Sequence, residues 1–152
     1  MEIERKFLIK ALPAPLSSFP KKRITQGYIS RSPAIRVRDT DGETRLTVKG
    51  KGKLAHEEFE LDITREAYDR LLKKAEGIII QKMRYLIPCP PYTVELDVFE
   101  GELSPLTVAE VEFPTVEEAE AFSPPEWFGR EVTCDKRYSN ANMTINGRPE
   151  TL

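Results

Sequence analysis

The sequence predicts a mostly β, α+β protein: a closed antiparallel eight-stranded β-tunnel with a charged lumen and a few flanking helices. Eight short segments alternate apolar and polar residues with a period of two, the pattern of a half-buried strand. Three further segments carry the start signals of a helix. About eight antiparallel strands suffice to close a barrel whose lumen holds a small ligand.

The expected strands are separated by turn and loop residues. Residues 35–38 and 46–49 flank a turn at 40–43, so these two strands form a hairpin. A Gly- and Lys-rich loop at 50–53 follows the hairpin. The full set of expected strands covers residues 2–7, 26–29, 35–38, 46–49, 58–63, 82–86, 93–98 and 108–113.

The expected helices begin at side chains that can act as N-caps. Thr64, Thr115 and Asp135 each have a side-chain oxygen that can accept a hydrogen bond from the first helical turn. Glu118, three residues after Thr115, completes a capping box. The segments that these residues begin are expected to end at residue 76, before residue 124 and near residue 143, respectively.

Length and composition predict one folded domain. The chain has 152 residues, of which 39% are hydrophobic, enough for one core. We expect a single domain over residues 1–145 and a loose tail over 146–152. Charged residues make up 32% of the chain, above the ~25% that is usual. This excess of charge requires an explanation.

The balance of the charges excludes several classes of protein. The formal net charge is −2, whereas binding to nucleic acid or to an anionic membrane needs a basic surplus. No apolar run approaches the ~18 residues of a transmembrane helix, and no signal peptide opens the chain. Cys89 and Cys134 lack a metal-binding spacing, and the chain has one His. We therefore expect a cytoplasmic protein that binds neither nucleic acid nor membrane.

The charged residues lie on one face of nearly every expected strand, because residues i and i+2 of a strand share a face. The pairs carry like charges, which repel unless opposite charges lie among them. A sheet with its charged face in water is the alternative, but such faces usually mix Thr, Ser, Gln and Lys. The inward candidates are the carboxylates Glu2, Glu4, Glu58, Glu60, Glu95, Asp97, Glu110 and Glu112 and the bases Lys6, Arg36, Arg38, Lys49, Lys82 and Arg84.

These inward candidates favour a site for a polyanion together with divalent metal. Eight carboxylates and six bases give a net charge of −2, which two divalent cations would bring to about +2. A phosphate chain is attracted to such a site. The apolar faces would then point outward, under helices or against a partner subunit, which favours a homodimer and leaves the oligomeric state open.

The same residues resemble a known family. Glu2-Ile3-Glu4-Arg5-Lys6 matches the ExExK signature of the CYTH superfamily, also called the triphosphate tunnel metalloenzymes. The paired residues of the other strands follow in order, and residues 135–138 resemble the C-terminal segment of the family. The resemblance covers nearly the whole chain, whose length is similar to that of the short bacterial inorganic triphosphatases.

The resemblance implies a tunnel that hydrolyses triphosphates with Mg²⁺ or Mn²⁺. It assigns metal binding to Glu2, Glu4 and Glu112, with Glu110 nearby. It assigns the phosphate clamp to Lys6, Arg36, Arg38, Lys49, Lys82 and Arg84. Lys6 or Lys82 would assist the leaving group, Glu4 would help to position the attacking water, and Glu58, Glu60, Glu95 and Asp97 would be supporting carboxylates.

Several functions remain open at this point. The first is hydrolysis of tripolyphosphate to pyrophosphate and phosphate, favoured because no aromatic or base-reading cluster accompanies the charged strands. The second keeps the chemistry with thiamine triphosphate or a nucleoside triphosphate, or cyclises ATP as an adenylate cyclase. The third is a non-catalytic polyphosphate-binding module, which would not need the metal carboxylates. The least favoured is a lipocalin-like barrel, whose lumen should be apolar.

Overall fold

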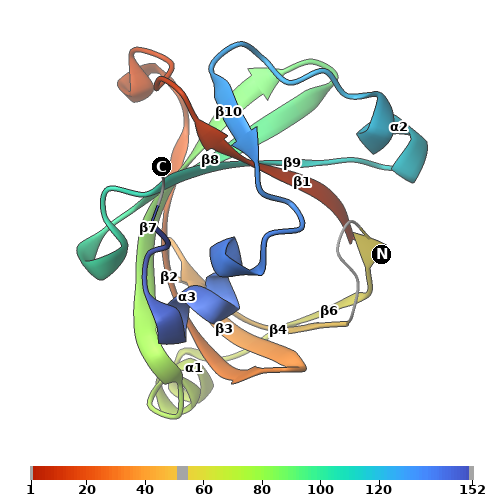
Figure 1. Cartoon of the computed structure of the whole chain (residues 1–152). Coiled ribbons are helices and arrows are strands. Elements are labelled where there is room, and N and C mark those ends of the chain that lie inside the picture. The colour runs from red at the N-terminus through yellow and green to blue at the C-terminus, as the bar shows by residue number, and fades with distance from the viewer. Residues whose placement is uncertain (1, 51–54, 151–152) are drawn as a thin grey trace.

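The computed structural model describes residues 2–50 and 55–150. An antiparallel sheet curls around a central space, with α1 and α2 on its outer side and α3 inside the curl (Figure 1). The strands are β1 (Glu2–Ile9), β2 (Lys21–Arg31), β3 (Ala34–Thr40), β4 (Glu43–Lys49), β5 (Ala55–His56), β6 (Glu58–Asp62), β7 (Glu76–Cys89), β8 (Tyr92–Phe99), β9 (Thr107–Glu112) and β10 (Phe128–Glu131). The helices are α1 (Arg65–Leu72), α2 (Val116–Ala121) and α3 (Asn140–Asn146), with 3₁₀ turns η1 (Leu16–Ser18), η2 (Gly101–Leu103) and η3 (Lys136–Tyr138).

All eight predicted strands are present, as β1 to β4 and β6 to β9. The predicted loop at 50–53 lies outside the described residues from 51 onward, as do residues 151 and 152 of the predicted tail. β2 and β7 are longer than predicted, with 11 and 14 residues, and they pair along most of their length. These two strands lie side by side at the left of the curl (Figure 1).

The prediction of a closed ring of eight strands is wrong. Over the described residues, nine strands form one open path in the order β10-β1-β9-β8-β7-β2-β3-β4-β6, and β5 pairs separately with β1. A closed ring would pair β6 with the second edge of β1. That edge is divided instead between β10, which pairs near Phe7 and Ile9, and β5, which pairs at Glu2 and Ile3.

The helix starts were predicted better than the helix ends. Thr64 and Thr115 cap α1 and α2, each accepting a hydrogen bond from the backbone N–H three residues on. α1 ends at Leu72, because the chain has already entered β7 at Glu76. The last predicted helix is two elements: Asp135 caps the short turn η3, and Ser139 caps α3.

Two apolar clusters hold the sheet and the helices together. The first joins the outer faces of β1, β8 and β9 to α2, with Phe7, Leu96 and Ala119 at its centre. The second lies under η3 and α3 and includes Tyr138 and Met143, both without solvent exposure. The apolar faces of β1, β8 and β9 therefore point outward, as predicted. Across the described ranges, 2–50 and 55–150, no helix has the length and apolar character that a membrane crossing requires.

Candidate active site

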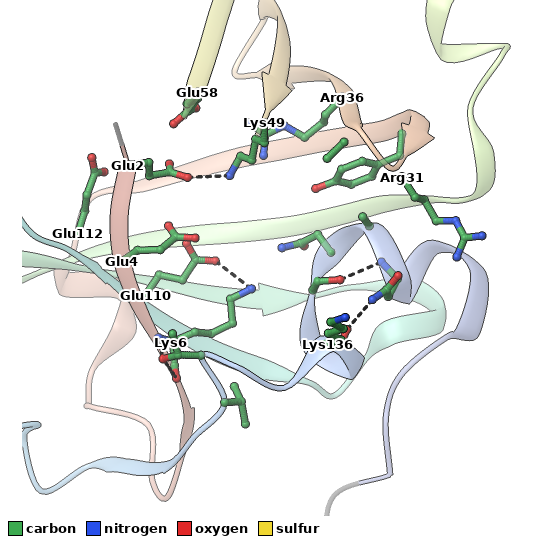
Figure 2. A pocket seen from close by; sticks show the side chains of 18 of the residues that line it. Glu2, Glu4, Lys6, Arg31, Arg36, Lys49, Glu58, Glu110, Glu112 and Lys136 are labelled. Carbon is green, nitrogen blue, oxygen red and sulfur yellow. Dashed lines mark hydrogen bonds and ion pairs between the residues drawn. The ribbon is translucent and has the colours of Figure 1, made fainter. Parts of the chain in front are cut away.

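The inner face of the sheet lines a cavity of about 820 Å³. Glu2, Glu4 and Lys6 enter it together, because alternate residues of β1 share a face (Figure 2). The neighbouring strands contribute their charged residues in the same way. Of the fourteen predicted site residues, twelve line the cavity: Glu2, Glu4, Lys6, Arg36, Arg38, Lys49, Glu58, Glu60, Arg84, Glu95, Glu110 and Glu112.

Carboxylates crowd the part of the cavity between β1 and β9. The strand register places Glu4 opposite Glu112, and Glu110 lies opposite Glu95 of β8. Burial raises the pKa of Glu4 to about 8, and the charges of Glu110 and Glu2 add to this effect. Burial and the charge of Glu2 also raise the pKa of Glu112. Like charges directly opposite each other destabilise a sheet, so this region needs a cation.

Two lysines partly meet that need. Lys49 Nζ lies 3.0 Å from Glu2 Oε1, and Lys6 Nζ lies 3.7 Å from Glu110 Oε1 (Figure 2). Burial opposes ionisation of Glu110, but Lys6, followed by Arg84 and Lys82, outweighs it and holds the pKa of Glu110 well below its usual range. Burial and the charge of Arg36 lower the pKa of Lys49, but the carboxylates Glu4 and Glu2 outweigh them and raise it.

β6 adds two carboxylates with different surroundings. Burial, followed by a hydrogen bond and the charge of Glu2, raises the pKa of Glu58 to about 7. Glu60 is more exposed and accepts a hydrogen bond of 2.7 Å from Arg45. This bond outweighs burial and lowers the pKa of Glu60. Glu58 therefore belongs to the crowded carboxylates, whereas Glu60 is tied to the outer edge of the sheet.

The arginines of β3 face the cavity without carboxylate partners among the described residues. Arg36 Nη2 donates to the Thr47 hydroxyl at 3.2 Å, and Arg38 Nε donates to Gln26 Oε1 at 2.8 Å. Burial lowers the pKa of Arg38 to about 9, and the charges of Arg36 and Arg84 lower it further. Among the described residues, the buried Nε of Arg36 and Nε2 of Gln26 have no hydrogen-bond partner. Guanidinium groups that line a cavity without carboxylate partners are suited to bind an anion.

The two remaining predicted residues, Lys82 and Asp97, lie beneath the cavity lining. Their side chains are 0% and 1% exposed, and Lys82 Nζ lies 2.8 Å from Asp97 Oδ2. Asp97 also accepts two hydrogen bonds from Arg84, at 2.8 and 2.9 Å. Burial lowers the pKa of Lys82 to about 7, against the opposing charge of Asp97. Arg84 therefore lines the cavity, whereas Asp97 and Lys82 are buried in the protein behind it.

The C-terminal segment forms a wall that the strand pattern did not predict. Arg31 at the end of β2 and Lys136 on η3 add two cations to the lining (Figure 2). Asn140 and Asn142 of α3 add amide groups, and Asn142 donates to the Lys136 carbonyl at 2.8 Å. Lys136 belongs to the segment that resembled the family, which is the only sequence signal for it.

The carboxylates provide the donor chemistry for a hard divalent cation. Glu2, Glu4, Glu110 and Glu112 supply oxygen ligands, which suit Mg²⁺ and Mn²⁺. Among residues 2–50 and 55–150, however, no three Asp, Glu, His or Cys side chains are close enough together to hold a metal by themselves. Mg²⁺ is commonly bound by one or two carboxylates together with substrate phosphates and water. The residues fit a metal of that kind.

The comparison with protein families decides the family. The CYTH domain matches residues 1–140, which is nearly the whole chain. The chain belongs to the CYTH domain family. Two curated relatives are similar over most of their length. The inorganic triphosphatase of Nitrosomonas europaea is 41% identical over 150 residues, 95% of this chain and 97% of the relative. That of Acetivibrio thermocellus is 38% identical over 149 residues, 95% of this chain and 94% of the relative.

Solved structures agree with the CYTH assignment. The crystal structure of the inorganic triphosphatase NE1496 is 38% identical to this chain and superimposes with a TM-score of 0.70, covering 95% of both chains. The PH1012 protein from Pyrococcus horikoshii, at 22% identity, superimposes with a TM-score of 0.60 over 80% of this chain and shares its fold.

Proposed function

We propose that this CYTH domain hydrolyses inorganic triphosphate, cleaving tripolyphosphate to pyrophosphate and phosphate with a divalent metal ion. The observation that carries the proposal is the cavity, where arginines without carboxylate partners face carboxylates without enough cations. A polyanion would pair with these arginines, and a divalent cation would neutralise these carboxylates. The two relatives named inorganic triphosphatases support this substrate.

The cations have the positions needed to hold a phosphate chain. In this proposal Lys6, Arg36, Arg38, Lys49 and Arg84 bind phosphoryl oxygens. Arginine presents a planar fork of N–H donors, which binds phosphate in a bidentate manner, and lysine supplies a point charge. Arg36 lines the cavity, and its buried Nε has no hydrogen-bond partner among the described residues. Donors fixed in place before the reaction stabilise the charge of the transferring phosphoryl group.

The metal belongs with the crowded carboxylates in this proposal. Glu2, Glu4, Glu110 and Glu112 would hold Mg²⁺ or Mn²⁺ together with the substrate. The raised pKa of Glu4 supports this, because a protonated carboxyl among other carboxylates ionises when a divalent cation binds. When bound, the ion neutralises phosphoryl oxygens and orients the chain.

The chain's own residues divide the remaining roles. Lys6 is the better of the two candidates for assisting the leaving group, because Lys82 lies beneath the lining and pairs with Asp97. Glu4 would position the attacking water. Asp97 and Glu95 would orient Arg84, since both contact its guanidinium, and Glu58 and Glu60 would extend the acidic wall.

Organic triphosphates are a weaker alternative. Of the described residues that line the cavity, Tyr28 alone is aromatic, so a thiazolium ring or a base has little to stack on. Thiamine triphosphatase, nucleoside triphosphatase and adenylate cyclase activities therefore remain alternative outcomes of the test. A polyphosphate-binding module without catalysis is another. A homodimer and a cytoplasmic location remain predictions from the sequence.

The test is phosphate release from tripolyphosphate with Mg²⁺, with Mn²⁺ and with EDTA. ATP, thiamine triphosphate and pyrophosphate run in parallel. We expect metal-dependent release that is fastest with tripolyphosphate, and a loss of at least about 10²-fold in Glu4→Gln. Glu66→Gln, on the exposed side of α1, is the matched control and should retain activity. Binding of tripolyphosphate without turnover in either protein would overturn the proposal in favour of a binding module.

A further inference from the structure

A second cavity, of about 430 Å³, lies apart from the charged cavity, and no residue lines both. We call it the outer pocket and define it by Leu8, Lys10, Leu12, Leu106, Arg130 and Arg148. These residues come from β1 and the chain that follows it, from the stretch that enters β9, from β10, which lies beside β1 in Figure 1, and from the segment after α3. The proposed triphosphatase reaction does not use it.

The outer pocket is lined by three basic residues and, among the described residues, by no acidic one. Lys10, Arg130 and Arg148 line it, and its described lining contains no Asp or Glu. Neither Lys10 nor Arg148 forms an ion pair or a side-chain hydrogen bond with any described residue. The pocket therefore offers positive charge that no described carboxylate within it neutralises.

Arg130 is held only loosely. It donates to the Tyr138 hydroxyl at 3.4 Å and lies 3.7 Å from Asp135. Asp135 has a closer partner in Arg137, at 2.6 Å. An anion in the outer pocket can therefore bind the Arg130 guanidinium without breaking a short ion pair.

Apolar side chains form the rest of the outer pocket. Leu106 is buried, Leu8 is half-buried, and Leu12 keeps 49% of its surface exposed. The volume is within the usual range for small-molecule sites, about 300–1,000 Å³. Inorganic phosphate or polyphosphate would use the cations but leave this apolar surface in water.

From this combination we propose that the outer pocket binds a small organic phosphate, with its phosphate group at Lys10, Arg130 and Arg148 and an apolar or aromatic body against Leu8, Leu12 and Leu106. The anion pairs with the three solvent-exposed cations, and the body removes the exposed leucine surface from water. Neither part of the ligand suffices alone.

The test uses 1-naphthyl phosphate, whose binding is followed by fluorescence anisotropy in the presence of saturating tripolyphosphate and EDTA. We expect saturable binding that is at least tenfold tighter than that of 1-naphthol or of inorganic phosphate. Lys10→Glu/Arg148→Glu should weaken it at least tenfold, and Leu12→Ser should weaken it independently. Arg130 is left unchanged, because it also contacts Asp135 and Tyr138.

The matched control is Lys73→Glu/Lys74→Glu, the same charge change at two exposed lysines just after α1. It should bind 1-naphthyl phosphate as the wild type does. The proposal is overturned if tripolyphosphate displaces the probe, if the two double variants lose equal affinity, or if Leu12→Ser binds normally. Near-native circular dichroism of each variant ensures that a loss of binding is not a loss of folding.

Discussion

Lys82 Nζ lies 2.8 Å from Asp97 Oδ2, at a point where neither side chain reaches solvent. The same carboxylate accepts two hydrogen bonds from Arg84, which lines the cavity. One buried carboxylate therefore compensates two cations and fixes the direction of the Arg84 guanidinium. The position of a cation in the cavity is set by a residue behind the cavity wall.

This sharing predicts unequal effects of two substitutions. Asp97→Asn leaves buried Lys82 without its carboxylate and Arg84 with the more distant Glu95 alone, and it should lower the free energy of unfolding by about 3–5 kcal/mol. Lys82→Met should cost less, because Asp97 keeps both hydrogen bonds to Arg84. Urea denaturation of the two variants measures the difference. Equal losses would show that Lys82, and not Arg84, accounts for the role of Asp97.

Arg36 is expected to matter for activity more than for stability. Its buried Nε has no partner among the described residues, so the folded protein gains little from it without substrate. We expect Arg36→Met to lower kcat/KM for tripolyphosphate by about 10²–10³-fold, as for other lost electrostatic donors, with no loss of thermal stability. Arg70→Met on exposed α1 is the control. Activity of Arg36→Met within threefold of the wild type would remove Arg36 from the phosphate clamp.

Gly77 is required by both its backbone and its neighbour. Its φ is +68°, and a Cβ there would overlap the backbone carbonyl of Thr144 in α3. Gly101 has a similar φ of +64° but nothing within 4 Å of the position of a Cβ. Gly101→Ala should therefore cost about 1–2 kcal/mol, the usual penalty of the left-handed region, and Gly77→Ala clearly more.

Gly77→Ala should also reduce activity, because α3 supplies Asn140 and Asn142 to the cavity wall. Thermal denaturation of both glycine variants, together with tripolyphosphate hydrolysis, separates the two effects. Equal destabilisation by the two substitutions would mean that α3 moves away from a Cβ at residue 77 without a loss of stability.

Asp135 predicts a defined dependence of stability on pH. Hydrogen bonds from Arg137 lower its pKa to about 2. Because this pKa lies below that of an unfolded Asp, the stabilisation is complete above about pH 4 and disappears as the pH falls through 2. Asn caps a helical turn as well as Asp does, so Asp135→Asn removes the charge alone. We expect a loss of less than about 1 kcal/mol at pH 7, as for exposed ion pairs.

The measurement is the difference in unfolding free energy between the wild type and Asp135→Asn from pH 7 to pH 2. The two curves should converge at the acid end. A difference that stays constant with pH would show that the substitution acts through capping, not through charge.

Strand alternation predicted the sheet because each inner face is charged and each outer face packs against apolar residues. Alternation failed to predict strands where the two faces no longer differ in this way. In β7, Ile78, Ile79 and Ile80 follow one another without alternation, so the first half of the strand was not predicted. β10 has four residues with Gly129 among them, and its partner β1 is distant in sequence. The prediction of a closed ring failed because local sequence patterns carry no information on which strand pairs with the free edge of another strand.

The same alternation placed twelve predicted side chains in the cavity and failed for particular reasons elsewhere. Arg31 was missed because the expected strand ended at residue 29, whereas β2 runs on to Arg31 after a register shift between Tyr28 and Ser30. Lys82 has the spacing of a lining residue, but Asn140 of α3 lies against its ammonium group at 3.4 Å. Lys82 is covered because α3, which begins 58 residues later in the chain, packs against it, and strand spacing cannot predict such a contact.

The pairing of β5 with β1 has a mechanical consequence. Fourteen-residue β7 is joined on both sides by long ladders, whereas the seam at β5 consists of two residue pairs, at Glu2 and Ile3. The wall of the cavity is therefore stiff at the arginines and compliant at the acidic seam. In the proposed reaction, a phosphate chain would meet a rigid cationic frame on one side and, on the other, carboxylates whose spacing could adjust to the size of a bound ion.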